Sequence, residues 1–476
     1  MNDRIYITTS IPYVNAAPHV GFALELVQAD VLARYHRLRG VETRHQTGTD
    51  EHAFKNVIAA RRAGVPTRAF VDRNAAEFRR LSTALDISHD DFLRTTEPRH
   101  RSAVEAFWRR LKPDDLELRS YTGLYCVACE DFYREADLLD GRCPEHGTEV
   151  AEVAEENVFF RLSRYEERLR SVIRSGELRI VPETRRREVL AFIERGLNDI
   201  SVTRAAERAG GWGIRTPGHH DQVIYVWIDA LINYLSGPGF GSGEAWTGWW
   251  APDARTVHVV GKNVWKFHAV YWPALLLSAD LPLPDDILVH GFLTAGGRKI
   301  GKSLGNAVDP FEWIDRVGAD AVRYYLVAGR SPFEDADVSE DRLLGTYEKD
   351  LANTLGNLVS RLLALGQRTG LALDPASPGE APPGYHRSFE DFALDGALAS
   401  VWAEFRALNR EIDAVAPWHL PAPRAREHVG AWLTRVAQLA QWLSPFLPGT
   451  ADRIAAYIAA GRVRRRPPLF PRGTTR

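Results

Sequence analysis

The stretch Ile11-Pro-Tyr-Val-Asn-Ala-Ala-Pro-His-Val-Gly-Phe22 decides the fold because of what stands on either side of it. Before it, Arg4 to Thr9 (RIYITT) is an apolar, β-branched run that predicts a buried strand. After the Pro18-His19 turn, a helical pattern runs from about Val20 to Arg39. Strand, turn and helix in this order open a nucleotide-binding βα unit, whose helix N-terminus faces phosphates. We therefore expect His19 at the mouth of that site, able to donate a hydrogen bond to a phosphate oxygen.

The composition of the chain limits the classes of protein to which it can belong. It has 476 residues, 45% hydrophobic and 26% charged, enough for two to four domains with substantial cores. No apolar run reaches membrane-spanning length, and three clustered cysteines do not suit a secreted disulfide framework. We expect a cytoplasmic protein. The formal charge of -2 argues against a wholly basic nucleic-acid binder but allows local basic patches.

A second glycine-rich segment reads Gly297-Arg-Lys-Ile-Gly-Lys-Ser-Leu-Gly-Asn306. Of the 60 basic residues excluding histidine only seven are lysine, so two lysines kept in one loop suggest a need for compact ammonium groups. Lys299 and Lys302 are accordingly candidates for contacting phosphates. The alternative is an exposed loop that happens to hold two lysines.

All three cysteines belong to one cluster. Cys126-Val-Ala-Cys129 is followed, after 13 residues, by Cys143-Pro-Glu-His146. Two tight turns that each present two soft ligands can close a tetrahedron around Zn²⁺, and four protein ligands leave no open position for catalysis. We expect one structural zinc; the alternative is unrelated buried thiols.

Taken together, these motifs resemble those of bacterial methionyl-tRNA synthetases with a single zinc knuckle, which are class I aminoacyl-tRNA synthetases. The resemblance runs from about Ile5 to near the C-terminus and also includes the stretches Gly48-Thr-Asp-Glu-His52, Tyr225 to Tyr234, Gly261-Lys262 and Phe267 to Pro273. It implies an α/β fold: a doubly wound, Rossmann-like parallel sheet with a zinc-bearing insertion and a C-terminal α-helical bundle. The implied domains are the first catalytic half (1–115), the insertion (116–200), the second catalytic half (201–295), the loop and stem (296–345) and an anticodon-binding bundle (346–476).

The same resemblance implies three sets of site residues. Methionine, unbranched and polarizable, suits aromatic and aliphatic walls, with a carboxylate for its ammonium group. The matching positions are Ile11, Tyr13, Asp50, Trp227, Ala230, Leu231, Tyr234, Val264 and His268. The positions for ATP are His19, Gly21, Phe22, Gly261, Asn263, Lys299, Lys302 and Ser303, of which His19, Lys299 and Lys302 are catalytic. Those for the anticodon are Asn357, Arg361 and Trp418, which suit stacking and hydrogen bonding to unpaired bases.

From about Thr346 onward, amphipathic patterns such as Tyr347 to Leu365 and Leu394 to Asp413 predict helices. The proline- and glycine-rich stretch Asp374 to Gly384 predicts a loop between them. Structural roles are the alternative for Arg361 and Trp418, as for Trp227 and Tyr234, which stand seven residues apart and could share one helical face.

Five positions depart from the family pattern. Phe22 stands where the family has a phosphate-donating histidine, and Asn263 replaces an aspartate expected near the ATP ribose. Ile300 and Gly301 replace the usual Met-Ser, and Ala53 replaces a glycine. Losing one donor as at Phe22 typically costs about 10²–10³ in rate.

The resemblance implies an enzyme that forms methionyl-adenylate from L-methionine and ATP, with Mg²⁺ as the phosphate counterion, and passes methionine to its tRNA. We expect a monomer, because the chain ends soon after Pro467-Pro-Leu-Phe-Pro-Arg. Two alternatives stay open: a diverged enzyme that transfers an aminoacyl adenylate to a small acceptor, and a tRNA-binding protein with an impaired site. Retained anticodon residues argue against the first, and retained His19, Asp50, Lys299 and Lys302 against the second.

Overall fold

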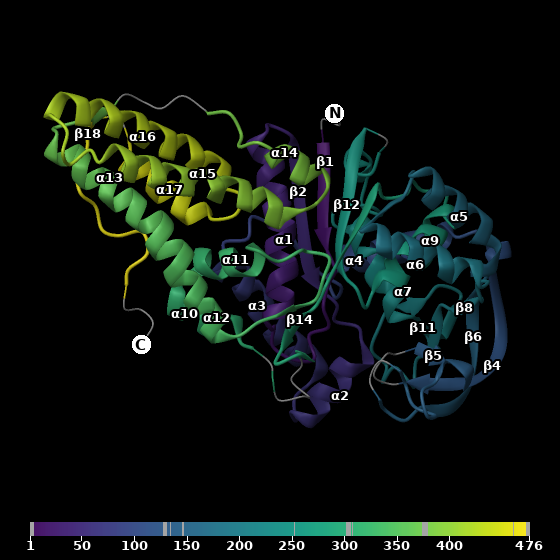
Figure 1. Ribbon diagram of the computed structural model, residues 1–476. Coiled ribbons are helices and arrows are strands. Elements are labelled where there is room, and N and C mark those ends of the chain that lie inside the picture. The colour runs from purple at the N-terminus through teal and green to yellow at the C-terminus, as the bar shows by residue number, and fades with distance from the viewer. Residues whose placement is uncertain are drawn as a thin grey trace. The chain divides into compact units, whose positions relative to one another are not determined.

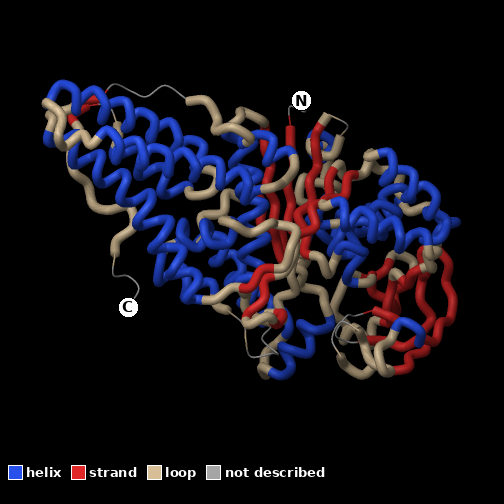
Figure 2. The backbone as a smooth tube through the Cα atoms, viewed as in Figure 1, coloured by secondary structure: helices blue, strands red, loops and turns tan. Residues whose placement is uncertain are grey.

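The computed structural model describes residues 4–126, 131–133, 135–144, 147–251, 253–300, 306, 308–373, 379–459 and 461–472 (Figures 1 and 2). The chain divides into two compact units. The first comprises Met1–Ala17, Val41–Arg80 and His89–Val289, and the second Pro18–Gly40, Leu81–Ser88 and His290–Arg476. The opening signature therefore contributes to both units.

The first unit is built on a six-stranded sheet with the strand order β3-β2-β1-β12-β13-β7. Its strands are β1 (Arg4–Thr9), β2 (Glu42–Thr49), β3 (Asp91–Arg94), β7 (Arg179–Val181), β12 (Ala254–Gly261) and β13 (Asp286–His290). β1 pairs in parallel with both β2 and β12, so the strand order reverses beside β1. In such sheets ligands bind beyond the carboxyl ends of the strands at that reversal.

The core of the first unit is rich in aromatic side chains. Tyr6 of β1, Phe107 and Trp272 are buried together, and the Phe107 and Trp272 rings stack 5.7 Å apart. The unit's helices are α2 (Phe54–Arg62), α4 (Pro98–Arg110), α5 (Glu166–Ser175), α6 (Glu183–Glu194), α7 (Val226–Leu231), α8 (Asn233–Ser236), the π-helical segment Phe267–Tyr271 and α9 (Trp272–Ser278). α3 (Thr67–Ala84) has residues in both units.

A separate antiparallel sheet with the order β5-β4-β6-β8 forms the insertion. Its strands are β4 (Leu116–Cys126), β5 (Asp131–Tyr133), β6 (Ala151–Phe160) and β8 (Ile200–Ser201). β4 and β6 pair from Leu116↔Phe160 to Tyr125↔Ala151 and form the long ribbon in Figure 1. A second small sheet joins β9 (Thr203–Ala205), β10 (Arg215–Thr216) and β11 (His219–Ile224). β7 lies within the residues expected to form the insertion, yet it pairs with β13 of the six-stranded sheet.

In the second unit, α1 (Val20–Leu38) is held by a buried ion pair. Asp30 of α1 and Arg323 of α11 (Ala319–Val327) lie 2.7 Å apart, and both side chains are fully buried. Arg323 also donates to the backbone carbonyls of Leu85, Pro445 and Phe446. Because these bonds satisfy its donors, the buried guanidinium joins α1 to three other segments without an uncompensated charge.

The remainder of the second unit is a small sheet and a helical bundle. The sheet has β14 (Leu293–Ala295) between β15 (Arg298–Lys299) and β16 (Ala336–Asp337). Its helices are α10 (Pro310–Val317), α12 (Glu340–Thr346), the π-helical segment Tyr347–Gly356, α13 (Asn357–Arg368), α14 (Tyr385–Glu390), α15 (Leu394–Val415), α16 (Ala422–Leu443) and α17 (Pro448–Tyr457). α13, α15, α16 and α17 form the bundle (green to yellow in Figure 1), and β17 (Ala372–Leu373) pairs with β18 (Gly461–Arg462) at its end.

The predicted fold class is confirmed by this parallel sheet with its helices and by the C-terminal bundle. The strand predicted at Arg4 to Thr9 is β1, and the helix predicted from Val20 ends at Leu38. The helix predicted from Leu394 runs two residues further than Asp413, to Val415. Residues 374–378 of the predicted loop lie outside the described residues.

The domain boundaries stay a prediction. Within the described chain, no helix has the length and apolar character needed to cross a membrane.

Candidate functional site

His19 caps the N-terminus of α1 with its own side chain. The amide of Gly21 donates to Nδ1 of His19 across 3.0 Å. A ring nitrogen that accepts a hydrogen bond carries no proton, so the neutral ring keeps its proton on Nε2, as a donor. Glycine is needed two residues on, because a Cβ at Gly21 would come within 2.8 Å of Cε1 of His19. The local sequence thus orients His19 as a hydrogen-bond donor at a helix N-terminus, where anions are favoured.

The lysine-bearing loop is connected to this same helix terminus. The amide of Val20 donates to the carbonyl of Val308 across 3.2 Å, just beyond the loop. On the other side, Lys299 ends β15, paired with Thr294 of β14, and Ile300 is buried at 5% exposure. Lys302 and Ser303 lie outside the described residues. The backbone therefore returns from the loop directly to the turn that carries His19.

The remaining positions expected to contact ATP have contrasting environments. Phe22, in the first turn of α1, is 7% exposed. Gly261 is buried at the end of β12, whereas Asn263 is exposed two residues later.

The departure from the family pattern at Ala53 has a simple structural basis. The backbone φ of Ala53 is -59°, an ordinary conformation, so alanine replaces glycine there without strain.

Asp50 follows β2 and is held by backbone contacts. Its amide donates to the carbonyl of Pro12 across 2.9 Å, and Asp50 forms an isolated parallel bridge with Tyr13. The amide of His52 donates to Oδ1 of Asp50 across 3.2 Å. Asp50 is 1% exposed, so its carboxylate is buried at the carboxyl end of β2, next to the segment that leaves β1. These two positions, 37 residues apart in the chain, are brought together as expected for one site.

A buried carboxylate that the sequence did not single out connects this loop to two helices. Asp229 of α7 accepts from Nδ1 of His52 at 2.6 Å and from Nε2 of His100 of α4 at 2.7 Å. Burial alone would raise the pKa of Asp229, but the electrostatic attraction of His52 and the hydrogen bonds from His100 and His52 lower that pKa to about 2. His52 and Asp229 stand in two of the stretches that carry the family resemblance. No local pattern predicts that they meet.

Glu51, between Asp50 and His52, adds further support to the same loop. Its carboxylate is fully buried and forms a bidentate pair with Arg94, at 2.6 and 2.9 Å. Its carbonyl accepts from Nε1 of Trp212 across 2.7 Å. Neighbouring segments therefore hold every residue from Asp50 to His52, which fixes the position of the buried Asp50 carboxylate.

Tyr13 and Trp227, both expected at the methionine side chain, lie together. Their ring centroids are 5.8 Å apart. Trp227 stacks on Phe267 at 3.9 Å with an interplanar angle of 7°. The sequence did not single out Phe267, although it directly precedes His268 in the stretch Phe267 to Pro273; that adjacency was the available signal. Three rings thus form a continuous apolar surface of the kind that a thioether contacts favourably.

Tyr234 and His268, both expected at the methionine site, form a second pair in this region. Nδ1 of His268 lies 2.9 Å from the carbonyl of Val264, which can only accept, so Nδ1 carries the proton. Nε2, 2.7 Å from the Tyr234 hydroxyl, therefore accepts from it. Burial lowers the pKa of His268 to about 4, which keeps the ring neutral near pH 7. Trp227 and Tyr234 belong to different helices, α7 and α8, rather than to one helical face.

The other expected methionine-site residues are less distinctive. Ala230 and Leu231 are buried in α7, at 5% and 1% exposure, and Ile11 is half-buried after β1. Leu231, Tyr234 and Val264 share one hydrophobic cluster, against which Tyr13 and Trp227 pack. This cluster places most of the predicted set in one region of the first unit.

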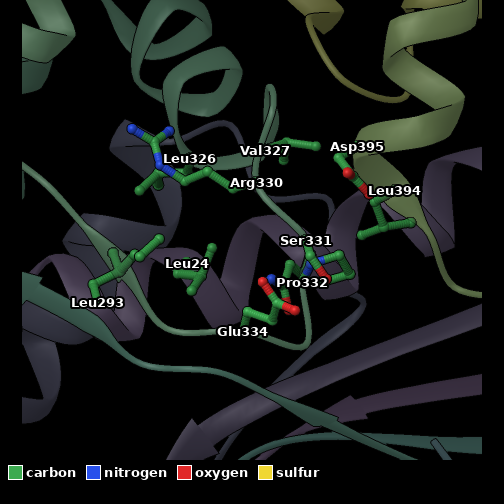
Figure 3. Close-up of a pocket in the computed structure, with 12 residues that line it drawn as sticks. Leu24, Leu293, Leu326, Val327, Arg330, Ser331, Pro332, Glu334, Leu394 and Asp395 are labelled. Carbon is green, nitrogen blue, oxygen red and sulfur yellow. The ribbon is translucent and has the colours of Figure 1, made fainter. Parts of the chain in front are cut away.

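Among the described residues, two of the small cavities each lie within a single unit. One, in the second unit, has a volume of about 10 Å³ and is lined by residues including Leu24, Leu326, Arg330 and Leu394 (Figure 3). The other, in the first unit, has about 30 Å³ and is lined by residues including His52, Arg204, Trp212 and Tyr225. These volumes hold about one or two water molecules. Neither cavity, as it stands, holds a nucleotide.

Cys126 and Cys143 of the predicted zinc set are described and buried, at 0% and 1% exposure. Thr148 links them: its hydroxyl lies 3.5 Å from Sγ of Cys126, and its carbonyl accepts from the amide of Cys143 at 2.9 Å. Cys129 and His146 lie outside the described residues. The two described cysteines, 17 positions apart in sequence, therefore meet at one place.

Two of the three expected anticodon residues are in contact. Cζ of Arg361 of α13 lies 5.6 Å from the centroid of the Trp418 ring, and Nη2 pairs with Asp413 at 2.7 Å. Trp418 is 42% exposed, which is uncommon for so large an apolar ring. Asn357 is exposed at the start of α13, one turn before Arg361. The exposed Asn357 and Trp418 and the half-buried Arg361 give this part of the bundle a polar and aromatic surface.

Comparisons with known proteins show the family to which this chain is related. The family model described as "tRNA synthetases class I (M)" matches residues 5–153 and 148–363. Methionine--tRNA ligase of Thermotoga maritima is 38% identical, over 95% of this chain and 74% of that protein. The Mycobacterium tuberculosis enzyme of the same name is 39% identical, over 94% and 91%. A solved structure of M. tuberculosis methionyl-tRNA synthetase in complex with methionyl-adenylate aligns with a TM-score of 0.90 at 35% identity, covering 98% of this chain and 100% of that one.

Proposed function

The chain belongs to the class I (M) tRNA synthetases, and from that premise we propose how its residues carry out the reaction of a methionine–tRNA ligase. The enzyme activates L-methionine with ATP and transfers it to the 3′ end of tRNA. A carboxylate oxygen of methionine attacks the α-phosphorus of ATP, and the bond to pyrophosphate breaks. A hydroxyl of the terminal ribose then attacks the carbonyl carbon, AMP leaves and the hydroxyl proton is lost.

The amino-acid assignment is carried by one observation: a buried carboxylate, Asp50, is bridged to Tyr13, whose ring is the first of an apolar aromatic surface. Asp50 would pair with the methionine ammonium group. Tyr13, Trp227 and Phe267 would contact the thioether, which suits their apolar faces. The neutral Tyr234–His268 pair adds no charge to this region, so an uncharged side chain is favoured there over a basic or acidic one.

The phosphate assignment rests on His19 and on the two lysines of the loop. His19 presents a donor at the N-terminus of α1, and fixed donors of this kind stabilise charge that grows on phosphates in the transition state. Lys299 and Lys302 would supply positive charge, and Gly261, Asn263 and Ser303 would contact the rest of the nucleotide. Mg²⁺ would enter with ATP as the phosphate counterion.

Phe22 and Asn263 weaken this nucleotide site relative to the family pattern. Phe22 offers no hydrogen-bond donor and is buried, so it packs at the first turn of α1 instead. We propose that His19 and the lysines carry the phosphate stabilisation alone, with slower adenylation as the consequence.

The tRNA assignment rests on Asn357, Arg361 and Trp418. The exposed Trp418 ring would stack on an unpaired anticodon base, while Arg361 and Asn357 would read base edges. Arg361 forms an ion pair with Asp413, and this pair orients the Arg361 guanidinium beside the Trp418 ring.

The zinc assignment rests on the chemistry of the donor set. Buried Cys126 and Cys143 meet at Thr148, as required for two halves of one tetrahedral site. Together with Cys129 and His146 they would hold one Zn²⁺, which would fasten the loops of the insertion. We further propose a cytoplasmic monomer, and gel filtration tests the monomer.

The deciding experiment is ATP–pyrophosphate exchange with a panel of amino acids, with and without tRNA. Methionine-dependent exchange, followed by charging of tRNA with a CAU anticodon, supports the proposal. Exchange with another amino acid but not methionine would overturn the amino-acid assignment. Adenylate that is passed to a small amine but never to tRNA would indicate a biosynthetic enzyme.

A further inference from the structure

Exposed arginines cluster at one end of the C-terminal bundle. They come from three segments: the end of α13, the start of α16 and the stretch that follows α17. We call them the arginine surface: Arg368, Arg424, Arg462, Arg464, Arg465 and Arg466.

Backbone contacts bring these three segments together. The amide of Arg465 donates to Oε1 of Gln367 across 2.7 Å, next to Arg368. β18 pairs with β17, with Arg462 opposite Ala372, which places the stretch after α17 along the end of α13. From α16, Nη2 of Arg426 donates to the carbonyl of Thr369 at 2.6 Å. Arg424 lies two residues before Arg426, at the start of the same helix.

In the part of the chain that the structure describes, the arginine surface has no ion-pair partner. Among the residues that the structure describes, none of its six members forms an ion pair, although other bundle arginines do, such as Arg435 with Glu404. Glu427, close by on α16, is not paired with any of them in the described chain. Six like charges in one region repel one another, and a bound anionic partner would relieve that repulsion.

The segment that carries most of these arginines is anchored at both ends. Val463 is buried at 3% exposure, and a Cβ on Gly366 would come within 2.7 Å of its Cγ1. Leu469 and Phe470 are buried at 2% and 5%, and the Tyr347 hydroxyl donates to the carbonyl of Pro471 at 2.9 Å. The arginines between these anchors are thus held in place, which reduces the entropy lost when a partner binds.

The arginine surface also continues from the candidate anticodon residues. Arg368 stands seven residues after Arg361 on α13, two turns along the same side and about 10 Å away. Arg361 lies over the Trp418 ring. In protein–nucleic acid complexes, phosphate contacts position the partner while base contacts specify it. A surface that binds phosphates next to a surface that contacts bases is therefore an arrangement suited to binding RNA.

We propose that the arginine surface binds the sugar–phosphate backbone of the tRNA next to the anticodon. The inference rests on the proposed function, because it takes the RNA to be the tRNA read by Asn357, Arg361 and Trp418. An anionic lipid surface is disfavoured. Arg464, Arg465, Arg466, Pro467 and Pro468 are exposed between the anchors, whereas the apolar residues of this segment are buried, leaving none for insertion into a bilayer.

The test is the salt dependence of tRNA binding by the full chain. We compare wild type with the triple variant Arg464→Gln, Arg465→Gln and Arg466→Gln between about 50 and 200 mM salt. Each lost phosphate contact lowers the slope of log K against log salt by about 0.7–0.9, so the slope falls by about 2 for three contacts. Methionine-dependent ATP–pyrophosphate exchange without tRNA stays at the wild-type rate, which shows that the variant is folded.

The chain offers a matched control in a second run of three arginines, Arg185 to Arg187 on α6. These pair with carboxylates of their own helix: Arg186 and Arg187 with Glu183, and Arg185 with Glu188. Replacing all three by Gln removes the same formal charge and leaves the slope for tRNA unchanged.

An unchanged slope and affinity in the Arg464–Arg466 variant, with wild-type tRNA binding intact, would overturn this inference while sparing the proposed function. Wild-type protein that binds no methionine tRNA at all would instead refute the proposed function. If the triple substitution abolishes binding to vesicles containing phosphatidylserine and leaves the tRNA slope unchanged, a membrane is the partner and the inference is wrong.

Discussion

The amide of Val20 donates a hydrogen bond to the carbonyl of Val308 across 3.2 Å. This bond joins the first turn of α1, which follows His19, to the backbone that leaves the lysine loop. The two signatures are far apart in sequence, yet their flanks share one hydrogen bond within the second unit. Because the bond uses backbone atoms only, it does not depend on which side chains occupy the loop.

Phe22→His tests whether the departure in the first signature limits adenylation. Histidine would restore a donor in the first turn of α1, and one donor to reacting phosphates is worth about 10²–10³ in rate. We expect faster methionine-dependent ATP–pyrophosphate exchange in the variant. Phe22→Leu, which adds no donor, serves as the control and should bring no gain. A slower Phe22→His enzyme would mean that the nucleotide site has been rebuilt around the aromatic ring.

Asp229→Asn tests the buried carboxylate that joins His52 and His100. The substitution removes one partner of a buried charged network, which typically costs about 3–5 kcal/mol in unfolding free energy. Because His52 also supports Asp50, we expect the KM for methionine to rise as well. Denaturant unfolding and exchange kinetics measure the two effects. Asp221→Asn, at an exposed carboxylate on β11, is the control. A loss of stability with unchanged KM would assign the network to the fold alone.

The stability of the protein should fall in acid because of His268. Its pKa is about 4 in the folded protein against the usual 6.5, so the unfolded chain binds the proton more tightly. The contribution of neutral His268 to the free energy of unfolding is fully present above about pH 6.5. It is lost as the pH falls toward 4. Between about pH 7.5 and about pH 5 the loss is about 2 kcal/mol, measurable by urea unfolding.

His268→Gln should make that pH dependence shallower, since glutamine does not titrate. Some dependence should remain, because burial also lowers the pKa of His258, and the substitution leaves His258 buried. An unaltered pH dependence in the variant would show that His268 is not responsible.

Cys126→Ser should remove the single zinc predicted for the insertion. Metal analysis of protein purified without chelators should find about one Zn²⁺ per chain in wild type and a large loss in the variant. Thr148→Val leaves the thiols of Cys126 and Cys143 in place and removes only the hydroxyl near Cys126. This variant should therefore retain the metal. Wild-type protein that contains no zinc would refute the metal assignment.

Trp418→Ala should weaken tRNA recognition and leave adenylation unchanged. Stacking of a base on an aromatic ring is worth about 1–3 kcal/mol, so the KM for tRNA should rise about 5- to 150-fold. Trp418→Phe keeps a stacking plane and should retain most of the affinity. Equal loss of exchange and charging would indicate damage to the fold rather than to the anticodon contact.

The features that could be predicted from the sequence are those that neighbouring residues encode. The β1 strand, the turn at His19 and helix α1 were predictable because period and turn residues are local properties. The residues expected to contact methionine were taken from family motifs and stay a prediction. Phe267 was missed even so, because stacking on Trp227 depends on how a π-helical segment lies against α7. Asp229 was missed because its partners, His52 and His100, are 177 and 129 positions away.

The sequence by itself determined the strand–turn–helix opening, the composition of the lysine loop and the spacing of the residues expected to bind zinc, since each is encoded by a few neighbouring residues. Only the tertiary structure decided which proton His268 keeps, what holds Asp50, and that Arg464 to Arg466 lie beside α13. These outcomes depend on burial and on contacts between distant segments. Such contacts form only when the whole chain packs, so no local pattern encodes them.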